Sequence, residues 1–327
     1  MIGAGSVGRR HAENLASLGC RLVMVDPRPD RRDAVEKESW CAGTHGDLSA
    51  ALSSHAVQGG VIASPTAFHA AQVVELSRAG VAILLEKPAA MDLASGQDAA
   101  RAAEAAGVPI LLGYTWRWWP PLLRIRELLQ DGAVGQPISV AFEMAAHLAD
   151  WHPFERYQDF FMASQALGGG ALLDESHWID ALIWLFGMPS RVAARVERVS
   201  DLEIDTDDNV DILAWYDNGI RATVHLDLYA RPHRRSCRIV GHDGTLEWTS
   251  GPDRIGYGAS SQTWVEERFD IERNEMFVSV AREFMSVLGG DPPRTCTVKD
   301  GLRALEIIEA ARRSSLEGRV ITLGSTS

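Results

Sequence analysis

Lysine is scarce in this chain of 327 residues, which has only Lys37, Lys87 and Lys299 beside 29 arginines. Basic residues are outnumbered as well, because 44 aspartates and glutamates against 32 lysines and arginines leave a formal charge of −12 at pH 7. Nucleic-acid binding needs a basic face. The charge therefore argues against a nucleic-acid partner.

Cysteine and long apolar runs are also rare. Cys20, Cys41, Cys237 and Cys296 lie far apart and form no Cys-x-x-Cys pair, which favours reduced thiols over a disulfide framework or a zinc site. No apolar run approaches the roughly 20 residues that span a bilayer, and the N-terminus lacks the pattern of an export signal. These absences predict a cytoplasmic protein without a membrane partner, and its length allows two domains.

One apolar stretch ends abruptly at three polar or rigid residues, in the sequence Val81-Ala-Ile-Leu-Leu-Glu-Lys-Pro88. Such a run is typical of a strand buried on both faces of a parallel sheet, and proline ends it because it lacks the next N–H. Lys87 is then expected at the carboxyl end of a central strand, where open α/β sheets bind ligands. An amine there suits catalysis, although a strand-end lysine can equally extend its tip into solvent.

A glycine turn precedes the first predicted helix. Its spacing fits Gly-x-Gly-x-x-Gly, which lets backbone approach a pyrophosphate and lets helix pack on strand. A chance glycine turn is the alternative. The cofactor-binding candidates in this turn are Gly3, Gly5, Ser6, Val7 and Gly8.

An acid follows at the end of the next predicted strand, 21–25. Asp26 lies near the usual offset of a carboxylate that binds ribose hydroxyls, which favours NAD over NADP. Just beyond it, Arg28, Arg31 and Arg32 could nevertheless accept a 2′-phosphate. Only Met1 and Ile2 precede the glycine turn, so either the start lies upstream or the central strand is cut short.

Strand and helix patterns alternate through the first half, which predicts right-handed crossovers and a doubly wound parallel sheet. A turn with the sequence Ser64-Pro-Thr-Ala-Phe-His69 opens one of the helices. From spacing alone, His69 fits an ordinary position on a helix face. Strands are predicted over 59–63, 81–88 and 108–112, and helices over 47–54, 69–79 and 93–106.

Three glycines and a pair of polar residues mark the second half. Gly168-Gly-Gly170 precedes Asp174 and His177, and the apolar residues that follow predict a helix ending near Gly187. Residues three apart face the same side of a helix, and a carboxylate that orients an imidazole suits proton transfer. A capping aspartate and a satisfied histidine are the structural alternative. No metal is expected, because no second ligand cluster has suitable spacing.

Beyond this segment, residues 192–248 predict strands joined by turns, and 277–288 and 301–317 predict helices. An open sheet with one face uncovered would expose apolar surface, so we expect it to pair with another copy. The expected domains are 1–118 and 119–327, with the last helix packed back on the first domain. Three tryptophans around Arg117 suit either a polar ligand or packing at a domain interface.

The chain resembles the glucose-fructose oxidoreductase, inositol 2-dehydrogenase and rhizopine catabolism family, Gfo/Idh/MocA. The resemblance rests on four segments in this order: the glycine turn, Glu86-Lys87-Pro88, the Gly168–His177 segment and the closing helix that begins at Gly301. The resemblance covers essentially the whole chain. It implies an α/β fold with an N-terminal Rossmann domain and a C-terminal α/β domain, whose large, mainly antiparallel open sheet forms homodimers or homotetramers.

The resemblance also implies residue roles. The catalytic set would be Lys87, Asp174 and His177, with the Lys87–Pro88 peptide bond cis. Further cofactor contacts would come from Ser64, Pro65, Thr66, His69, Glu86, Lys87 and Arg117. The substrate would meet Lys87, Arg117, Trp151, His152, Tyr157, Asp174 and His177.

These features predict an NAD-dependent dehydrogenase that oxidises a secondary hydroxyl of a sugar, a sugar derivative or a cyclitol. Two alternatives remain open. The fold could use transient oxidation by NAD for elimination or glycoside cleavage, or it could serve a non-catalytic regulator that binds a dinucleotide or a sugar.

Overall fold

The computed structural model describes residues 1–151 and 155–324. The chain divides into two compact units: the first comprises Met1–Trp118 and Arg273–Leu302, and the second comprises Trp119–Glu272 and the residues from Arg303 onward. Among the described residues, no helix is both long enough and apolar enough to cross a membrane.

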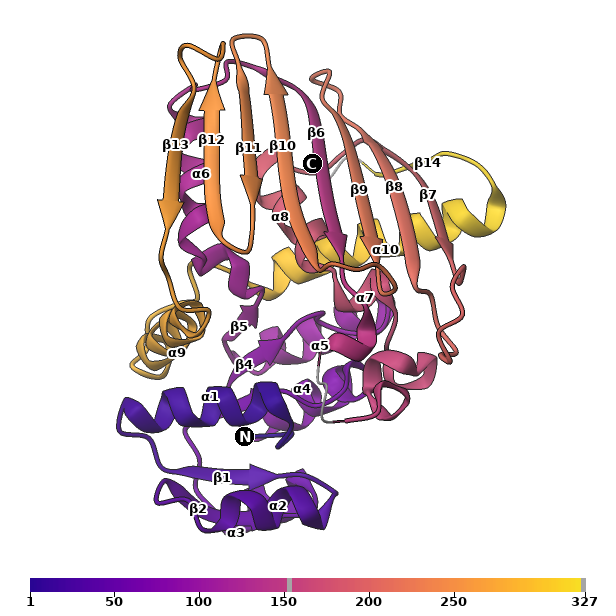
Figure 1. The fold of residues 1–327 in the computed structure, drawn as a ribbon. Helices are drawn as coiled ribbons and strands as arrows, with labels where there is room; N and C mark the ends of the chain where they lie inside the picture. The colour runs from indigo at the N-terminus through magenta and orange to yellow at the C-terminus, as the bar shows by residue number, and fades with distance from the viewer. Residues whose placement is uncertain (152–154, 325–327) are drawn as a thin grey trace. The chain divides into compact units, whose positions relative to one another are not determined.

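The first unit is a parallel sheet with helices (Figure 1). Its strands are β1 (Leu22–Val25), β2 (Cys41–His45), β3 (Gly59–Ile62), β4 (Ala82–Glu86) and β5 (Ile110–Gly113). Its helices are α1 (Ser6–Ser17), α2 (Pro29–Glu36), α3 (Leu48–Ser54), α4 (His69–Arg78), α5 (Leu93–Ala105) and α9 (Asn274–Leu288). Strands β3, β4 and β5 pair in that order, and β1 pairs with β2, all in parallel.

The residues before the glycine turn join these two groups of strands. Ile2 bridges in parallel to both Val25 of β1 and Ile62 of β3. The Ile2 N–H donates to the Val61 carbonyl at 2.8 Å, and the Gly3 N–H donates to the Val25 carbonyl at 2.8 Å. A very short segment thus occupies the central position of the sheet, and the glycine turn leaves from that position.

Helix α9 completes the core of the first unit, although it lies far along the chain. Its residues Val280, Ala281 and Phe284 are at most 2% exposed and cluster with Leu15 of α1 and Leu84 of β4. Burial of this apolar face ties α9 to the parallel sheet. Residues 273–302 therefore belong with the first unit, whereas the sequence analysis grouped them with 119–327.

The second unit is built on a nine-stranded sheet in the order β13-β12-β11-β10-β6-β9-β8-β7-β14. Only the β6–β9 pair is parallel, so the predicted mainly antiparallel sheet is confirmed. The strands are β6 (Pro137–Ala145), β7 (Arg191–Glu197), β8 (Asn209–Trp215), β9 (Arg221–Asp227), β10 (Arg234–Gly241), β11 (Thr245–Thr249), β12 (Asp253–Gly258), β13 (Val265–Phe269) and β14 (Ile321–Thr322).

Helices cover one face of this sheet, where α6 (Pro120–Gln130), α8 (His177–Phe186) and α10 (Val298–Glu317) lie behind it in Figure 1. Trp178 of α8 packs against Phe142 of β6 and Trp248 of β11, with ring centroids 5.4 and 6.0 Å away. Along the strands, buried residues alternate with exposed ones, as expected when helices cover a single face.

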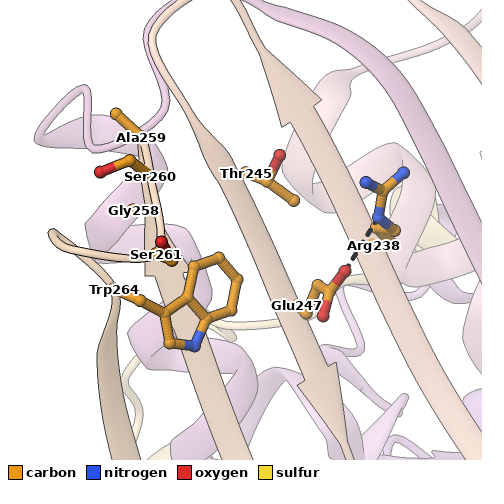
Figure 2. Close-up of a pocket in the computed structure, with 8 residues that line it drawn as sticks. All are labelled: Arg238, Thr245, Glu247, Gly258, Ala259, Ser260, Ser261 and Trp264. Carbon is orange, nitrogen blue, oxygen red and sulfur yellow. Dashed lines mark hydrogen bonds and ion pairs between the residues drawn. The ribbon is translucent and has the colours of Figure 1, made fainter.

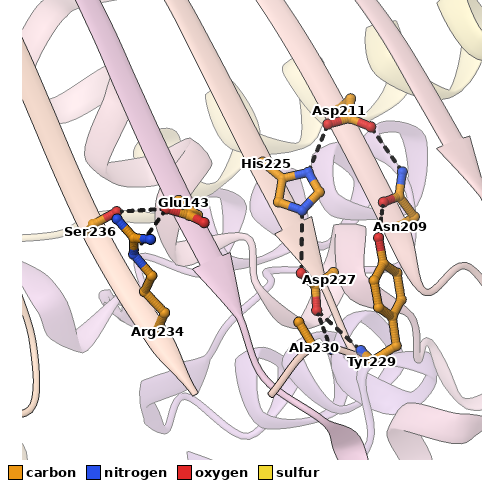
Figure 3. A network of polar contacts seen from close by, with 9 residues as sticks. All are labelled: Glu143, Asn209, Asp211, His225, Asp227, Tyr229, Ala230, Arg234 and Ser236. Atoms are coloured by element: carbon orange, nitrogen blue, oxygen red, sulfur yellow. Dashed lines mark hydrogen bonds and ion pairs between the residues drawn. The ribbon is translucent and has the colours of Figure 1, made fainter. Parts of the chain in front are cut away.

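The uncovered face carries a polar network over its central strands (Figure 3). His225 lies between two carboxylates, with Nδ1 2.7 Å from Asp211 and Nε2 3.3 Å from Asp227. Beside it, Glu143 accepts a hydrogen bond from Ser236 at 3.0 Å and pairs with Arg234 at 3.2 Å. The hydrogen bonds to Asp227 and Asp211 raise the pKa of His225 to about 9.

This raised pKa predicts a pH dependence of stability. A histidine with a raised folded-state pKa stabilises the fold fully below its unfolded value, about 6.5, and the stabilisation disappears as the pH rises through about 9. The melting temperature of a His225→Gln variant should therefore fall below that of the wild type at pH 6 and approach it at pH 10. NMR titration of His225 should give a midpoint near 9, lowered in Asp211→Asn. A midpoint near 6.5 in the wild type would contradict the network.

Candidate active site

The glycine turn forms the start of α1. A Cβ on Gly8 would lie 1.9 Å from the Gly3 carbonyl oxygen, so only glycine allows α1 to pack this closely. A Cβ on Gly5 would meet only Arg31 Nη1, at 3.7 Å. Gly5 is also the N-cap of α1, and no side chain caps the helix there. Backbone N–H groups at such an end suit an anionic group such as a pyrophosphate.

Asp26 is fixed at the end of β1. Its carboxylate is 2% exposed and accepts hydrogen bonds from the backbone N–H groups of Ala4, at 2.8 Å, and Arg28, at 3.0 Å. The same carboxylate lies 3.7 Å from Arg31 Nη1. The Arg28 side chain pairs with Asp30, 3.1 Å from Nε to Oδ1. The acid predicted to bind ribose is therefore held against the glycine turn.

The loop after β3 contains Ser64, Pro65 and Thr66 and leads into α4. His69, the first residue of α4, is 1% exposed. Its Nδ1 lies 2.8 Å from the Pro88 carbonyl oxygen and its Nε2 lies 2.9 Å from the Ser64 carbonyl oxygen. Burial lowers the pKa of His69. Both ring nitrogens thus face backbone carbonyls, so His69 joins this loop to the segment after β4.

Glu86 and Lys87 lie where β4 ends, as the apolar run predicts. Glu86 is 8% exposed, and its Oε1 lies 2.6 Å from Nε2 of the buried His11. The other oxygen, Oε2, accepts a hydrogen bond from the Lys87 backbone N–H at 3.2 Å. The Lys87–Pro88 peptide bond is cis, which confirms that prediction. Sequence reasoning assigned no role to His11.

Arg117 is buried within the first unit. Its guanidinium donates to the Thr295 carbonyl at 3.0 Å and lies 3.3 Å from Asp300. The adjacent Trp118 donates its indole N–H to Glu283 at 3.0 Å. These partners lie in the late segment that joins the first unit, a contact that the local sequence did not indicate. The predicted contacts of Arg117 with cofactor and substrate stay predictions.

In the second unit, the segment around Asp174 differs from the sequence prediction. The predicted helix that ends near Gly187 is confirmed as α8, but Asp174 belongs to a separate short helix, α7 (Ala171–Asp174), so Asp174 and His177 do not share one helix. Between them, the Ser176 N–H donates to Leu173 and the Trp178 N–H donates to Glu175, so i→i−3 bonds replace the α-helical pattern. Asp174 ends α7 and His177 begins α8.

Buried polar residues surround this break. Asp174, Glu175, Ser176 and Asp180 are at most 6% exposed, whereas His177 is only half-buried. A half-buried imidazole that follows a buried carboxylate can exchange a proton with a ligand. Among the described residues, no group of three or more histidines, cysteines or acids is placed to hold a metal ion.

The acidic segment 205–208, to which the sequence patterns assigned no role, contacts the glycines before α7. Gly170 has φ +102°, and a Cβ there would lie 2.4 Å from Asp207 Oδ1. Asp207 accepts a hydrogen bond from the Leu172 N–H at 2.8 Å, and the Thr206 hydroxyl donates to the Gly169 carbonyl at 3.2 Å. Burial raises the pKa of Asp207. The run of acidic residues at 205–208 was the only local feature of the sequence that could have indicated this contact.

The predicted substrate residues of the second unit lie before the triple glycine. Trp151 is half-buried, and the Tyr157 hydroxyl accepts a hydrogen bond from the Glu203 N–H at 3.2 Å. His152 lies outside the described residues. The structure thus places Lys87, Glu86, His69, Arg117 and the glycine turn in the first unit. It places Asp174, His177, Trp151 and Tyr157 in the second.

A separate hollow of about 260 Å³ opens on the uncovered face of the nine-stranded sheet (Figure 2). Arg238 and Glu247 pair across part of it at 2.9 Å, and the Trp264 indole packs against Gly256, where a Cβ would lie 2.5 Å from the ring. The hollow contains none of the predicted site residues. The lining is Arg238, Thr245, Glu247, Gly258, Ala259, Ser260, Ser261 and Trp264.

Comparison with known proteins decides the family. A model described as the NAD-binding Rossmann fold of an oxidoreductase family matches residues 1–114, and one described as the GFO/IDH/MocA C-terminal domain matches residues 122–247. This chain belongs to the Gfo/Idh/MocA family. It is an NAD-binding oxidoreductase, which confirms the predicted family, fold, enzyme class and cofactor.

Curated relatives resemble the chain over nearly its whole length. D-apiose dehydrogenase from Paraburkholderia graminis is 26% identical, over 99% of this chain and 89% of the relative. Inositol 2-dehydrogenase from Rhizobium meliloti is 25% identical, over 99% of this chain and 98% of the relative. A levoglucosan dehydrogenase solved with NADH and levoglucosan has a TM-score of 0.88 at 18% identity, over 99% and 98% of the two chains. At that identity, the likeness shows the fold.

The residues of the first unit fit NAD. The backbone at Gly5, where a Cβ would meet only Arg31 Nη1, and the uncapped start of α1 suit the pyrophosphate, and the fixed carboxylate of Asp26 suits the ribose hydroxyls. These residues would hold the dinucleotide at the carboxyl ends of the parallel strands.

Two alanine substitutions separate packing from cofactor binding. Gly8→Ala should destabilise the fold without cofactor by about 1–3 kcal/mol or more, because the new methyl group overlaps the Gly3 carbonyl. Gly5→Ala should change stability by no more than about 0.5 kcal/mol but weaken NADH binding at least tenfold, because its methyl group fills space for the pyrophosphate. Melting curves and tryptophan-fluorescence titrations with NADH test both. Wild-type NADH affinity in Gly5→Ala would refute this placement.

Proposed function

We propose that this oxidoreductase reversibly oxidises a secondary hydroxyl of a sugar, a sugar derivative or a cyclitol. Its relatives are named for such compounds, apiose and inositol, and a structural neighbour was solved with levoglucosan. The observation that carries the proposal is the position of Lys87. It follows β4, and its neighbours Glu86 and Pro88 contact His11 of α1 and His69 at the start of α4, in the two segments predicted to hold NAD.

Three side chains of this chain would carry the chemistry. His177 would take the hydroxyl proton, and Asp174 would orient its imidazole. Lys87 would donate a hydrogen bond to the same oxygen and stabilise the negative charge that develops there. NAD, when bound, supplies the acceptor for the hydride from the carbinol carbon. Loss of this proton and hydride converts the alcohol to a ketone, and the reverse steps reduce it.

The remaining predicted residues would shape the substrate site. Trp151 and Tyr157 would contribute flat, partly polar surfaces that suit a sugar ring, with His152 from the same stretch. Arg117 would act from the first unit. A polyol or sugar is thus the expected small-molecule partner.

Two other functions use the same residues differently. In the first, oxidation is transient and enables elimination or glycoside cleavage, so no net NADH accumulates. In the second, the protein is a regulator that binds a dinucleotide or a sugar without turnover. Retention of Lys87, Asp174 and His177 favours catalysis. Net NADH formation with a polyol or a sugar identifies the dehydrogenase, and consumption of the substrate without net NADH formation separates transient oxidation from a regulator.

Replacing Lys87 tests the catalytic role. Lys87→Met should abolish turnover, because the oxygen loses its cationic hydrogen-bond donor, while the dissociation constant of NADH should stay within a few-fold of the wild-type value. Lys37→Met, at an exposed lysine just after α2, is the matched control and should retain activity. Steady-state kinetics and NADH fluorescence measure the two quantities. Wild-type turnover in Lys87→Met would exclude the role.

We also infer that the enzyme is a cytoplasmic homodimer or homotetramer that pairs through the uncovered sheet face. The thiol state of the four cysteines suits a reducing compartment. On the uncovered face, Leu213 of β8 is 48% exposed and lies between Ala193 of β7 and Thr223 of β9. Such small and apolar side chains suit a close contact between sheets.

A charge on that face should weaken the assembly. Leu213→Glu should shift the protein toward monomers at concentrations where the wild type is oligomeric, because a carboxylate would be buried without a partner. Leu316→Glu is the control, since Leu316 is 88% exposed on α10. Light scattering after size-exclusion chromatography measures the mass. A monomeric wild type, or equal effects of the two variants, would count against this interface.

A further inference from the structure

Two buried histidines contact the Glu86-Lys87-Pro88 segment, and the proposed chemistry uses neither of them. His11 of α1 is 0% exposed and His69 of α4 is 1% exposed. His11 contacts the residue before Lys87, and His69 contacts the residue after it. We infer that His11 and His69 are positioning residues, which hold the Lys87 backbone and thereby set where its amine lies.

The contact between His11 and Glu86 is buried and closely packed. His11 Nε2 lies 2.6 Å from Glu86 Oε1, and His11 Nδ1 has no hydrogen-bond partner among the described residues, so Glu86 is the single hydrogen-bond partner found for this ring. The edge of the ring meets Phe277 of α9, with centroids 5.4 Å apart. Gly113 of β5 pairs with Glu86 of β4 and leaves room for its carboxylate, because a Cβ on Gly113 would lie 3.2 Å from Glu86 Cδ.

Burial explains why the hydrogen bonds of Glu86 should hold its carboxylate in one orientation. A carboxylate that leaves water needs hydrogen bonds to replace its hydration. Glu86 obtains one from His11 and a second from the Lys87 backbone N–H at 3.2 Å. Rotating the carboxylate toward one donor would break its bond to the other. The backbone at Lys87 is therefore tied to helix α1.

The His69 contact restrains the other side of Lys87. Its Nδ1 lies 2.8 Å from the Pro88 carbonyl oxygen, and its Nε2 lies 2.9 Å from the Ser64 carbonyl oxygen. A neutral ring can donate to only one of these carbonyls, whereas the protonated ring donates to both. In either state, the ring fills the space between the loop after β3 and the segment after β4. Lys87 is thus flanked on both sides by side chains from segments predicted to bind NAD.

The functional consequence rests on the proposed role of Lys87 in catalysis. A catalytic group displaced by about 1 Å can lose on the order of 10²-fold in rate. If these histidines position Lys87, their loss should lower kcat far more than it weakens NADH binding. Because α1 and the loop after β3 also form the predicted cofactor site, the segments that receive the dinucleotide would themselves set the position of Lys87.

The scarcity of lysine makes the position of Lys87 directly observable. Protein labelled with ¹³C at the lysine ε-carbon gives signals from Lys37, Lys87 and Lys299 alone, and Lys87→Met assigns the Lys87 signal. In His11→Phe and in His69→Phe, the Lys87 signal should shift or broaden, while the other two signals stay in place. This readout does not require turnover.

Steady-state kinetics provide a second test of the positioning role. His11→Phe and His69→Phe should each lower kcat by about tenfold to a hundredfold, and His11→Phe should leave the NADH dissociation constant and the substrate KM within about threefold of wild type. His11→Gln restores a hydrogen-bond donor toward Glu86 and should recover most of kcat. If His11→Phe proves too unstable to assay, Glu86→Gln tests the same link, because its carboxamide cannot accept from both His11 and the Lys87 N–H without a change in geometry.

The outcomes separate the two proposals. An unmoved Lys87 signal with wild-type kcat in both phenylalanine variants overturns the positioning role, whatever Lys87 does. An inactive Lys87→Met beside those unchanged variants keeps the proposed function and removes this inference. A displaced Lys87 signal in the histidine variants, together with an active Lys87→Met, keeps the positioning role and removes the proposed chemistry. Equal losses of kcat in His11→Gln and His11→Phe also count against the His11 contact.

Discussion

The hydrogen bonds of the buried Glu86 carboxylate are the interaction that connects the separate parts of the first unit around Lys87. It lies at the end of a strand whose residues Ile83, Leu84 and Leu85 are at most 1% exposed. A charge in such surroundings needs hydrogen bonds to replace its hydration. His11 and the Lys87 backbone N–H each supply one, to different oxygens of the carboxylate. The requirement to satisfy one acid therefore connects the sheet, the helix after the glycine turn and the lysine.

A comparable arrangement holds the segment before the predicted catalytic residue Asp174 in the second unit, where Asp207 takes the place of Glu86. Asp207 and Thr206 bond to the backbone around the triple glycine, and α7 starts from that point. Gly170 accommodates them because it has no side chain and adopts a positive φ. In both units, polar side chains from elsewhere in the chain fix the backbone next to a predicted catalytic residue.

Local patterns predicted a large part of this architecture. The apolar run before Glu86 predicted a buried strand, and the helices predicted over 47–54 and 93–106 correspond to α3 and α5, which Asp47 and Asp92 cap in the structure. The patterns over 192–248 predicted strands joined by turns, and the family resemblance implied that they form a large open sheet. These features depend on neighbours within a few residues, so the sequence displays them directly.

Contacts between distant residues account for what the sequence did not reveal. His11 and Glu86 are 75 positions apart, and nothing in the helix pattern around His11 distinguishes it from an ordinary core residue. The break between α7 and α8 follows a segment held by acids more than 30 positions away, 35 for the bond from Leu172 to Asp207. Arg117 likewise meets Thr295 across 178 positions. Spacing rules carry no information about such partners.

The late helix α9 has a consequence for how the protein is made. Its apolar face contributes to the same core as α1 and the parallel strands, and Asn14 and Asn274, 260 positions apart, hydrogen-bond to each other. Chains emerge from the ribosome N-terminus first. The cofactor-binding half must therefore wait, with part of its apolar surface uncovered, until most of the second unit has been synthesised. Translation order and folding order thus differ in this protein, because the core of its first unit is completed by a helix that is translated after residues 119–272 of the second unit.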